Sequence, residues 1–299
     1  MAHYLFAHFT GETQQGEQVY FSVSKDGMHW TDLNGGNPVV CSEIGEKGVR
    51  DPFIIRSQID GWFYIIATDL RIASKKGWDV AQYAGSTQMI IWRSKDLITW
   101  SQPWTFQPDI SKIGCVWAPE AIYDSKREQY MVFWASMIQE DGDIEPKQKI
   151  FCAYTKDFHE FSSPIKYIEK THHIIDTTIV EENGVYYRFS KDETTKNIQM
   201  DCGMDLQGPF QEVKADKLNE LMGVEGPAAF PLIKQGQWCL LVDRFATQEG
   251  YLPLVSDDLS NGIFHIVEET EYDMGVTKKR HGSVLLLLQE EYDRLVTQL

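Results

Sequence analysis

The sequence is short of cysteine and of basic residues, and each shortage argues against a class of protein. The 5 cysteines among 299 residues lie far apart, form no Cys-x-x-Cys pair and are odd in number. They are therefore expected to be reduced thiols rather than a disulfide framework. Lys and Arg number 28 against 44 Asp and Glu, which gives a formal net charge of -16. The basic residues are scattered rather than gathered into a stripe, so we expect no nucleic-acid partner.

Long hydrophobic runs are also missing. No window approaches the ~18 apolar residues of a membrane-spanning helix, so we expect no membrane partner. The first residues, MAHYLFAHFTGETQQGEQ, lack a basic segment followed by a continuous apolar one and do not resemble a signal peptide. These features predict a cytoplasmic protein and leave its oligomeric state open. The acidic composition suits a neutral small-molecule partner.

Helical periodicity is scarce, whereas short runs rich in aromatic and β-branched residues are frequent. Examples are WFYIIATD, YMVFWAS and QWCLLVD. Hydrophobic residues make up 42% of the chain, which is enough to form a large packed core. Short apolar runs separated by turn residues predict an all-β fold. We interpret residues 1–299 as a single domain.

Two interleaved repeats divide the chain into five units. In the first repeat, a strand is followed by Ser or Thr, Lys, Asp, a short turn and an aromatic residue; copies lie at 19–33, 90–103 and 151–164, with looser ones at 200–213 and 253–267. The Asp at the strand exit is expected to accept hydrogen bonds from its own turn. In the second repeat, an apolar strand leads through a turn into an aromatic-rich strand. Self-similarity of this length indicates a repeated architecture.

The two chain ends complete one another. The N-terminus opens with the outer half of a unit and lacks an inner strand, whereas the C-terminus ends soon after an inner strand. A ring of units closed by both termini explains this pattern. We therefore predict a five-bladed β-propeller with four antiparallel strands per blade. A β-sandwich would also contain many short strands, but it would not explain the interleaved repeats.

The first residues of the inner strands are expected to converge at one mouth of the central channel. They are Asp51, Ala118, Asp176, Glu225 and His281. Alone, Asp51 before a proline would be read as a turn residue and His281 as a core histidine. Three carboxylates around one axis, however, would repel one another and lose hydration, which is typical of catalytic sites. Cleavage of a glycosidic bond is the reaction that most needs such paired acids.

Side chains that could contact a sugar lie near these positions. The aromatic candidates Trp78, Phe53 and Trp117, with Phe245 nearby, could stack on sugar rings, although each could equally serve packing. Trp78 lies near the tip of segment 69–86, which is expected to form part of one wall. Arg244, a charge leaving an apolar strand, is a candidate contact to a sugar hydroxyl or else a partner in a salt bridge.

The motifs at the five entrances resemble those of the five-bladed β-propeller glycoside hydrolases of family 43. In chain order they read RDPFI, WAPEAIYD, IIDTTI, VEGPAAF and RHGSV, and their order and spacing match over the full chain. One departure is Glu120, because many relatives carry Asp or Ser after Trp-Ala-Pro.

The resemblance implies an inverting hydrolase in which Asp51 is the general base that deprotonates water. Glu225 would be the general acid that protonates the departing oxygen. Asp176 would orient this acid and keep its pKa raised. His281 would be a ligand or water organiser of a structural calcium ion in the channel, with several waters completing the shell. The chemistry itself would require no cofactor.

The substrate implied by the resemblance is a plant cell-wall pentoside. We expect an exo-acting α-L-arabinofuranosidase that releases arabinose from arabinoxylan- or arabinan-derived oligosaccharides, and hence a role in xylan degradation. β-Xylosidase activity, alone or in addition, is the main alternative. A propeller phosphorylase would add a cluster of cations for phosphate, where we find only Arg50, Arg244 and Arg280 nearby. A non-catalytic carbohydrate-binding propeller would not need three acids.

Overall fold

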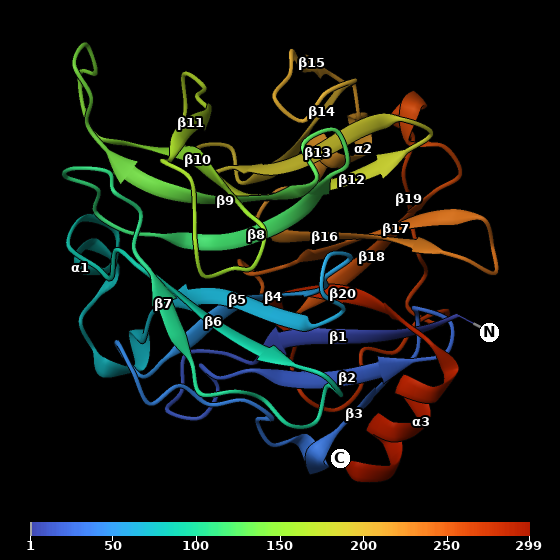
Figure 1. Ribbon diagram of the computed structural model, residues 1–299. Helices are drawn as coiled ribbons and strands as arrows, with labels where there is room; N and C mark the ends of the chain where they lie inside the picture. Colours follow the sequence, from blue (N-terminus) through green and yellow to red (C-terminus); the bar gives the residue numbers. More distant parts are fainter. Residues whose placement is uncertain (1) are drawn as a thin grey trace.

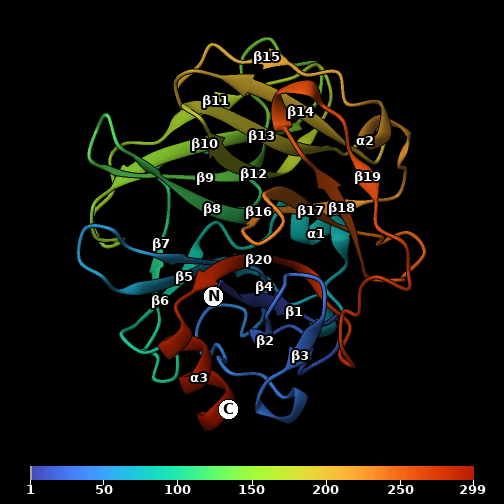
Figure 2. The same ribbon diagram turned by 90° about the vertical axis from the view of Figure 1, so that its right-hand side faces the viewer.

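The aromatic and β-branched runs form the strands of five separate sheets. Within residues 2–299, which the computed structural model describes, each sheet contains four antiparallel strands. Figure 1 and Figure 2 show these sheets following one another along the chain as the blades of a propeller. The predicted all-β, five-bladed fold is confirmed.

Four of the blades are continuous in sequence, and in each of them the strands pair in chain order. The first two contain β4 (Val49–Arg56), β5 (Phe63–Asp69), β6 (Met89–Ser94), β7 (Trp104–Phe106), and then β8 (Trp117–Asp124), β9 (Gln129–Ile138), β10 (Lys147–Thr155) and β11 (Ile165–Ile168). The next two contain β12 (Ile174–Glu182), β13 (Val185–Asp192), β14 (Asn197–Gly203), β15 (Gln211–Glu212), and then β16 (Glu225–Leu232), β17 (Gln237–Asp243), β18 (Tyr251–Ser256) and β19 (His265–Ile266).

The fifth blade joins the two ends of the chain, as predicted. Its inner strand is β20 (Arg280–Leu287), and its other strands are β1 (His3–Phe9), β2 (Tyr20–Ser24) and β3 (Trp30–Asp32). The red strand β20 lies beside the blue strand β1 in Figure 1, and the two pair antiparallel with Leu5 opposite Leu285. The N-terminal segment thus supplies three strands and the C-terminal segment one.

Helices are few and short. The α-helices are α1 (Trp78–Tyr83), α2 (Asp216–Glu220) and α3 (Gln289–Gln298), and the 3-10 segments are η1 (Asn34–Gly36), η2 (Ile72–Ser74) and η3 (Leu259–Asn261). Across residues 2–299, no helix combines the length and the apolar character needed to cross a membrane. α3 lies against the closing blade, where Leu295 is buried among its apolar side chains.

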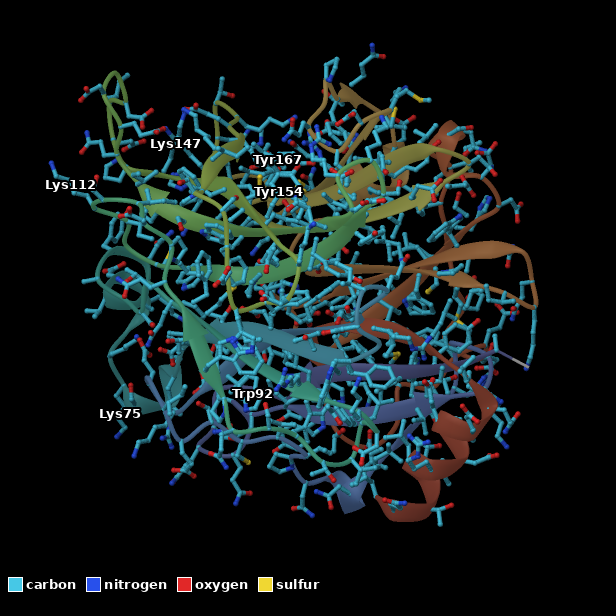
Figure 3. All side chains as sticks on the ribbon, viewed as in Figure 1. Lys75, Trp92, Lys112, Lys147, Tyr154 and Tyr167 are labelled. Atoms are coloured by element: carbon cyan, nitrogen blue, oxygen red, sulfur yellow. The ribbon has the colours of Figure 1, made fainter. Side chains whose placement is uncertain are left out.

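The core lies between the blades. Each pair of neighbouring blades shares one hydrophobic cluster, and strand β5 shows how this arises. Phe63, Ile65 and Ala67 pack toward the closing blade, whereas the intervening Tyr64 and Ile66 pack toward the β8–β11 blade. Successive side chains of a strand point to opposite faces, so a strand buried on both sides needs a continuous apolar run. Trp92, labelled in Figure 3, lies within the first of these clusters.

The repeated Ser/Thr-Lys-Asp motif forms the predicted turn. In the first copy, Asp26 Oδ1 accepts hydrogen bonds from the backbone N–H groups of Met28 and His29 at 2.8 and 2.9 Å. Asp96 and Asp157 accept equivalent bonds in the second and third copies. The Asp carboxylate therefore replaces the backbone acceptors that a tight turn lacks.

We predict that Leu295→Ala lowers the free energy of unfolding by about 2–5 kcal/mol, because it leaves a cavity in a packed cluster. Leu295 is fully buried, whereas Val296 on the same helix is 50% exposed. Val296→Ala is therefore the matched control and should change stability by no more than about 0.5 kcal/mol. Urea unfolding measures both variants. Equal losses would contradict the docking of α3 on the closing blade.

Candidate active site

A cavity of about 460 Å³ lies where the inner strands of the five blades begin. All five inner strands contribute to its lining, through Arg50 and Asp51 of β4, Trp117 of β8, Ile175 and Asp176 of β12, Glu225 of β16, and Arg280 and His281 of β20. This volume falls in the range of small-molecule sites. The structure thus brings the three predicted carboxylates and the predicted histidine together.

A β-bulge interrupts each of the first four inner strands at the cavity. The pairing register shifts directly after Arg50, Trp117, Ile175 and Glu225. The next residue in each strand has a positive φ, with values of 50° at Asp51, 46° at Ala118, 50° at Asp176 and 53° at Gly226. Residues other than glycine rarely adopt this left-handed backbone conformation. It costs them roughly 1–3 kcal/mol each, and such strained residues cluster at functional sites.

The bulges correct the sequence-based alignment of the inner strands. Gly226, not Glu225, is the counterpart of Asp51, Ala118 and Asp176, and Glu225 stands one residue earlier. Glycine is required at 226 because an added Cβ would lie 2.7 Å from Cγ of His281. Glu225 nevertheless reaches the cavity from its earlier position, as Arg50 and Arg280 do.

Asp51 is held by two neighbours. Thr68 Oγ1 donates a hydrogen bond of 2.8 Å to Oδ2, and His281 Nδ1 lies 3.4 Å from Oδ1. Thr68 Oγ1 also accepts a bond from the backbone N–H of Ala118 at 2.8 Å, which ties the first two bulges together. Burial acts to raise the pKa of Asp51, but the contacts with His281, the charge of Arg50 and the bond from Thr68 outweigh it and lower the pKa. Asp51 is therefore ionised at neutral pH.

Asp176 is held by a backbone donor and lies near His281. Its Oδ2 accepts a hydrogen bond from the backbone N–H of Gly226 at 3.1 Å, and its Oδ1 lies 3.7 Å from His281 Nδ1. Burial raises the pKa of Asp176 to about 6, against the lowering charges of His281 and Lys191. Asp176 can therefore take up a proton under mildly acidic conditions.

Each carboxylate oxygen of Glu225 accepts a hydrogen bond from a cationic side chain. Lys191 Nζ lies 2.8 Å from Oε2, and Arg280 Nη2 lies 2.9 Å from Oε1. Burial acts to raise the pKa of Glu225, but Lys191, followed by Arg280 and Arg50, lowers it below its usual value. This corrects the expectation that Asp176 keeps the pKa of Glu225 raised, because the two cations outweigh the neighbouring acid.

His281 lies between two carboxylates at the position of the predicted structural calcium ion. Burial acts to lower the pKa of His281, but Asp176 and Asp51 raise it to about 9. The imidazole is therefore a buried cation between Asp51 and Asp176 at neutral pH. The calcium ion stays a prediction, in which Asp51 and Asp176 are the neighbouring oxygen donors and waters would complete a shell of six to eight oxygens.

The predicted aromatic and arginine contacts divide into two groups. Trp78 and Trp117 line the cavity, together with Phe245, and the rings of the two tryptophans meet edge to face with centroids 6.1 Å apart. Segment 69–86 thus supplies part of the wall through Trp78 of α1. Phe53 does not line the cavity, because it faces the hydrophobic cluster shared with the β8–β11 blade. Arg244 also lies outside the lining and pairs with Glu249 at 3.4 Å, which is the salt-bridge alternative.

A family model described as a "Probable glycosyl hydrolase domain", glycosyl hydrolase 43-related, matches residues 1–293. The chain belongs to the glycosyl hydrolase 43-related family. This confirms the resemblance to family 43, and it agrees with the cluster of carboxylates at the mouth of a five-bladed propeller. The protein is accordingly a glycoside hydrolase by family.

Relatives of this glycosyl hydrolase 43-related chain differ in activity. An α-L-arabinofuranosidase from Bifidobacterium longum subsp. longum is 26% identical over 319 residues, which cover 92% of this chain and 29% of that protein. An endo-1,4-β-xylanase structure from Bacteroides thetaiotaomicron has a TM-score of 0.60 at 15% identity, covering 89% of this chain and 90% of that one. An exo-β-1,3-galactanase structure from Phanerochaete chrysosporium has a TM-score of 0.59 at 13% identity, covering 86% and 57%. At such identities the two structures support the fold alone.

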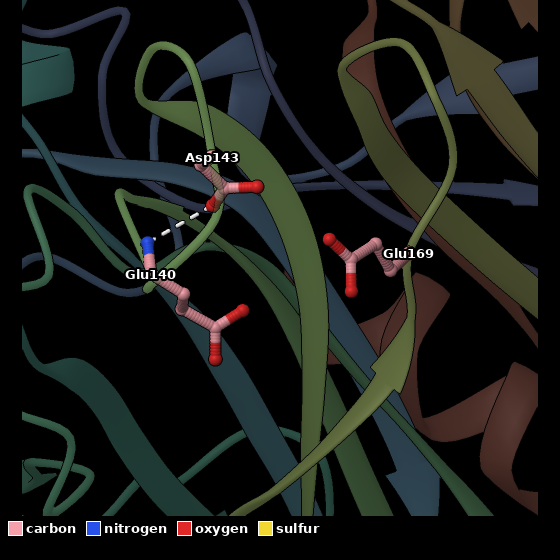
Figure 4. A group of neighbouring side chains, drawn as sticks. All are labelled: Glu140, Asp143 and Glu169. Atoms are coloured by element: carbon pink, nitrogen blue, oxygen red, sulfur yellow. Dashed lines mark hydrogen bonds between the residues drawn. The ribbon is translucent and has the colours of Figure 1, made fainter.

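A second acidic cluster of this family member lies away from the cavity. Within residues 2–299, one group of metal-ligating side chains has its ligand atoms within 4.8 Å of one another: Glu140, Asp143 and Glu169, shown in Figure 4. Lys149 Nζ lies 2.5, 2.7 and 2.9 Å from these three carboxylates. The buried ammonium supplies the positive charge that a metal ion would supply, so we assign no metal here.

Sequence reasoning missed two residues of the hydrolase site. Lys191 ends an aromatic-rich strand of the second repeat and was not among the predicted site residues, although its side chain is only 3% exposed and reaches Glu225. Glu120 was noted as a departure from the family pattern, and it is buried in the channel beside Asp176 and His281. A charged residue within an otherwise apolar strand was the available signal in both cases.

We predict that Glu120→Gln removes a pH dependence of stability. Burial raises the pKa of Glu120 to about 8, so this carboxyl is neutral in the folded protein at neutral pH. A carboxyl whose folded-state pKa is raised stabilises the fold at low pH, and this contribution declines as pH rises from ~4.3 toward the folded-state pKa. The variant should therefore gain stability relative to the original protein from pH ~5 to pH ~8, by up to about 1.4 kcal/mol per pH unit.

Urea unfolding at a series of pH values measures this difference. Glu160→Gln is the matched control, because Glu160 is exposed. A constant difference between Glu120→Gln and the original protein across that range would contradict a neutral, buried Glu120.

Proposed function

We propose that the chain is an inverting, exo-acting α-L-arabinofuranosidase that releases arabinose from arabinoxylan- or arabinan-derived oligosaccharides. The main support is the cavity of about 460 Å³ in which Asp51, ionised, and the Asp176–Glu225 pair share one space. The named activity of the Bifidobacterium longum relative favours the arabinoside. A cavity of this volume suits one or two sugar rings better than a long polymer. A cytoplasmic location stays a sequence-based proposal.

Asp51 acts as the base in this proposal. It is ionised, and Thr68 and His281 hold its two oxygens in place. Water attacks the anomeric carbon and transfers a proton to Asp51 as the new C–O bond forms. Because attack occurs from the face opposite the leaving group, the configuration inverts. The positive charge of His281 lowers the pKa of Asp51, so the carboxylate stays ionised and can accept the proton from water.

Glu225 acts as the acid. Asp176 and Glu225 interact, so protons bind to the pair rather than to either residue independently. The raised pKa of Asp176, about 6, places this uptake in the mildly acidic range. When the proton resides on Glu225, it is transferred to the glycosidic oxygen as the C–O bond to the anomeric carbon breaks. Trp78 and Trp117 supply apolar faces against which a sugar ring can stack.

We predict that Asp51→Ala and Glu225→Ala respond differently to the leaving group. Loss of a general acid or base should lower kcat/KM by ~10²–10⁴ on an arabino-oligosaccharide. Nitrophenolate departs without protonation, so Glu225→Ala should lose much less activity on nitrophenyl α-L-arabinofuranoside, whereas Asp51→Ala should lose activity on both. Glu160→Ala is the control at an exposed acid.

Initial rates on the two substrates measure this difference. Equal losses by Glu225→Ala on both would contradict its role as the acid. Nitrophenyl β-xyloside is assayed beside them, and release of nitrophenol from this compound alone would make a β-xyloside the substrate in place of the arabinoside. No release from either nitrophenyl glycoside would overturn the proposed activity. A first-formed sugar of retained configuration, detected by NMR, would overturn the single-displacement mechanism.

We predict a bell-shaped pH profile of kcat/KM with its optimum on the acidic side of neutrality. The alkaline limb should fall as pH rises through the titration of the Asp176–Glu225 pair, because Asp176 has a pKa of about 6 and that of Glu225 is lowered. The acidic limb should fall below the lowered pKa of Asp51, as the base becomes protonated. Steady-state rates in constant-ionic-strength buffers measure both limbs. Activity that still rises beyond pH ~8 would contradict the assignment.

A further inference from the structure

Lys191 is a buried charged group to which the proposed reaction assigns no role. It lies on β13, the second strand of its blade, and its side chain is 3% exposed. The ammonium lies 2.8 Å from Glu225 Oε2 and 2.6 Å from Glu193 Oε2. It also lies 4.2 Å from the centroid of the Phe245 ring. Lys191, Glu193, Glu225 and Phe245 all line the cavity.

The charges that face Glu225 come from every neighbouring strand. Asp176 on β12, Asp243 on β17 and the cations Arg50 on β4, Lys191 on β13 and Arg280 on β20 surround it, with His281 adjacent to Arg280. Of these, Arg280 and Lys191 make direct hydrogen bonds to the carboxylate. Each of the two oxygens therefore contacts a cation, and both contacts favour the ionised carboxylate over the protonated one.

The two cations differ in their freedom to withdraw. Arg280 Nε is bound at 2.5 Å to Oδ2 of Asp243, a fully buried residue, so moving the guanidinium would leave that carboxylate without its partner. Lys191 has a second acceptor in Oε2 of Glu193, whose side chain is 28% exposed at the wall of the cavity and whose other oxygen pairs with Lys196. The lysine stem is flexible, and its ammonium is a point charge that can keep one partner while it releases the other.

We propose that Lys191 is a positioning residue for Glu225, an inference that rests on the proposed function. In the resting site its ammonium holds Glu225 Oε2 in an ion pair. When solvent delivers a proton to Oε2, the ammonium releases Oε2, keeps its contact with Glu193 and remains protonated, so Glu225 becomes the neutral acid that faces the substrate. Lys191 thereby sets the pH at which Glu225 becomes protonated. Glu193 is the alternative partner of the Lys191 ammonium.

Lys191→Met tests this inference. Without the ammonium, Glu225 should take up its proton at higher pH, and the alkaline limb of kcat/KM should move up by about one pH unit or more. Lys191→Arg retains the charge and should restore the limb toward its original position. The matched control is Lys149→Met, which also removes a buried lysine bound to carboxylates, but outside the cavity. It should lower stability without moving the limb.

Carboxyl ¹³C NMR titration supplies a readout that does not depend on turnover. The resonance of Glu225, assigned by its loss in Glu225→Gln, should titrate at higher pH in Lys191→Met than in the original protein. Such a shift without hydrolysis of any arabinoside or xyloside would support the role of Lys191 while the proposed function fails. An unchanged Glu225 titration, or an equal limb shift in Lys149→Met, would overturn the inference.

Glu193→Gln tests the same inference if Lys191→Met does not fold. The substitution removes the negative charge of the alternative partner, so the ammonium should stay on Glu225 and move the Glu225 titration to lower pH. A shift to higher pH or no shift in Glu193→Gln would overturn the inference.

Discussion

The pairing of β1 with β20 is the interaction on which the rest of the structure depends. It closes the ring of blades and sets the fifth inner strand beside β16 and β4. That strand carries Arg280 and His281, which place positive charge among Asp51, Asp176 and Glu225. Without closure, three buried carboxylates would face one another with fewer cations, and the cost of their desolvation would oppose folding. Closure of the ring and assembly of the site are thus one event.

Hydroxyl groups connect the inner strands around the channel mouth. Thr68 links Asp51 to the backbone of Ala118, and the Tyr251 hydroxyl donates to Gly226 O at 2.8 Å while accepting from the Gly282 N–H at 3.0 Å. Ser283 of β20 accepts from the Ile54 N–H of β4 at 2.8 Å. Bulges leave backbone groups without ladder partners, and buried groups of this kind must be satisfied. These bonds therefore hold the strained bulges, and with them the carboxylates, in fixed positions.

The protonation of the site follows from cations rather than from the mutual repulsion of acids. Three carboxylates around one axis would each raise the pKa of the others. The pKa of Asp176 is raised, mainly by burial, whereas that of Glu225 is lowered, because Lys191 and Arg280 each contact one of its oxygens. Asp51 and His281 stabilise one another as an ion pair. Carboxyl groups within one small cavity thus differ in pKa because each contacts different charged partners.

The sequence by itself determined the number of blades, the closure by both termini, the Asp-stabilised turns and the convergence of Asp51, Asp176, Glu225 and His281. These properties depend on strand periodicity and on turn residues that are close together in the chain. Tertiary structure alone decided that Gly226 occupies the fourth bulge, that Phe53 faces a blade interface, and that Lys191 and Arg280 bind Glu225. The physical reason is distance along the chain. A charged partner on another blade changes the pKa of a carboxyl group through space, and no local pattern in the sequence shows which residues will be such partners.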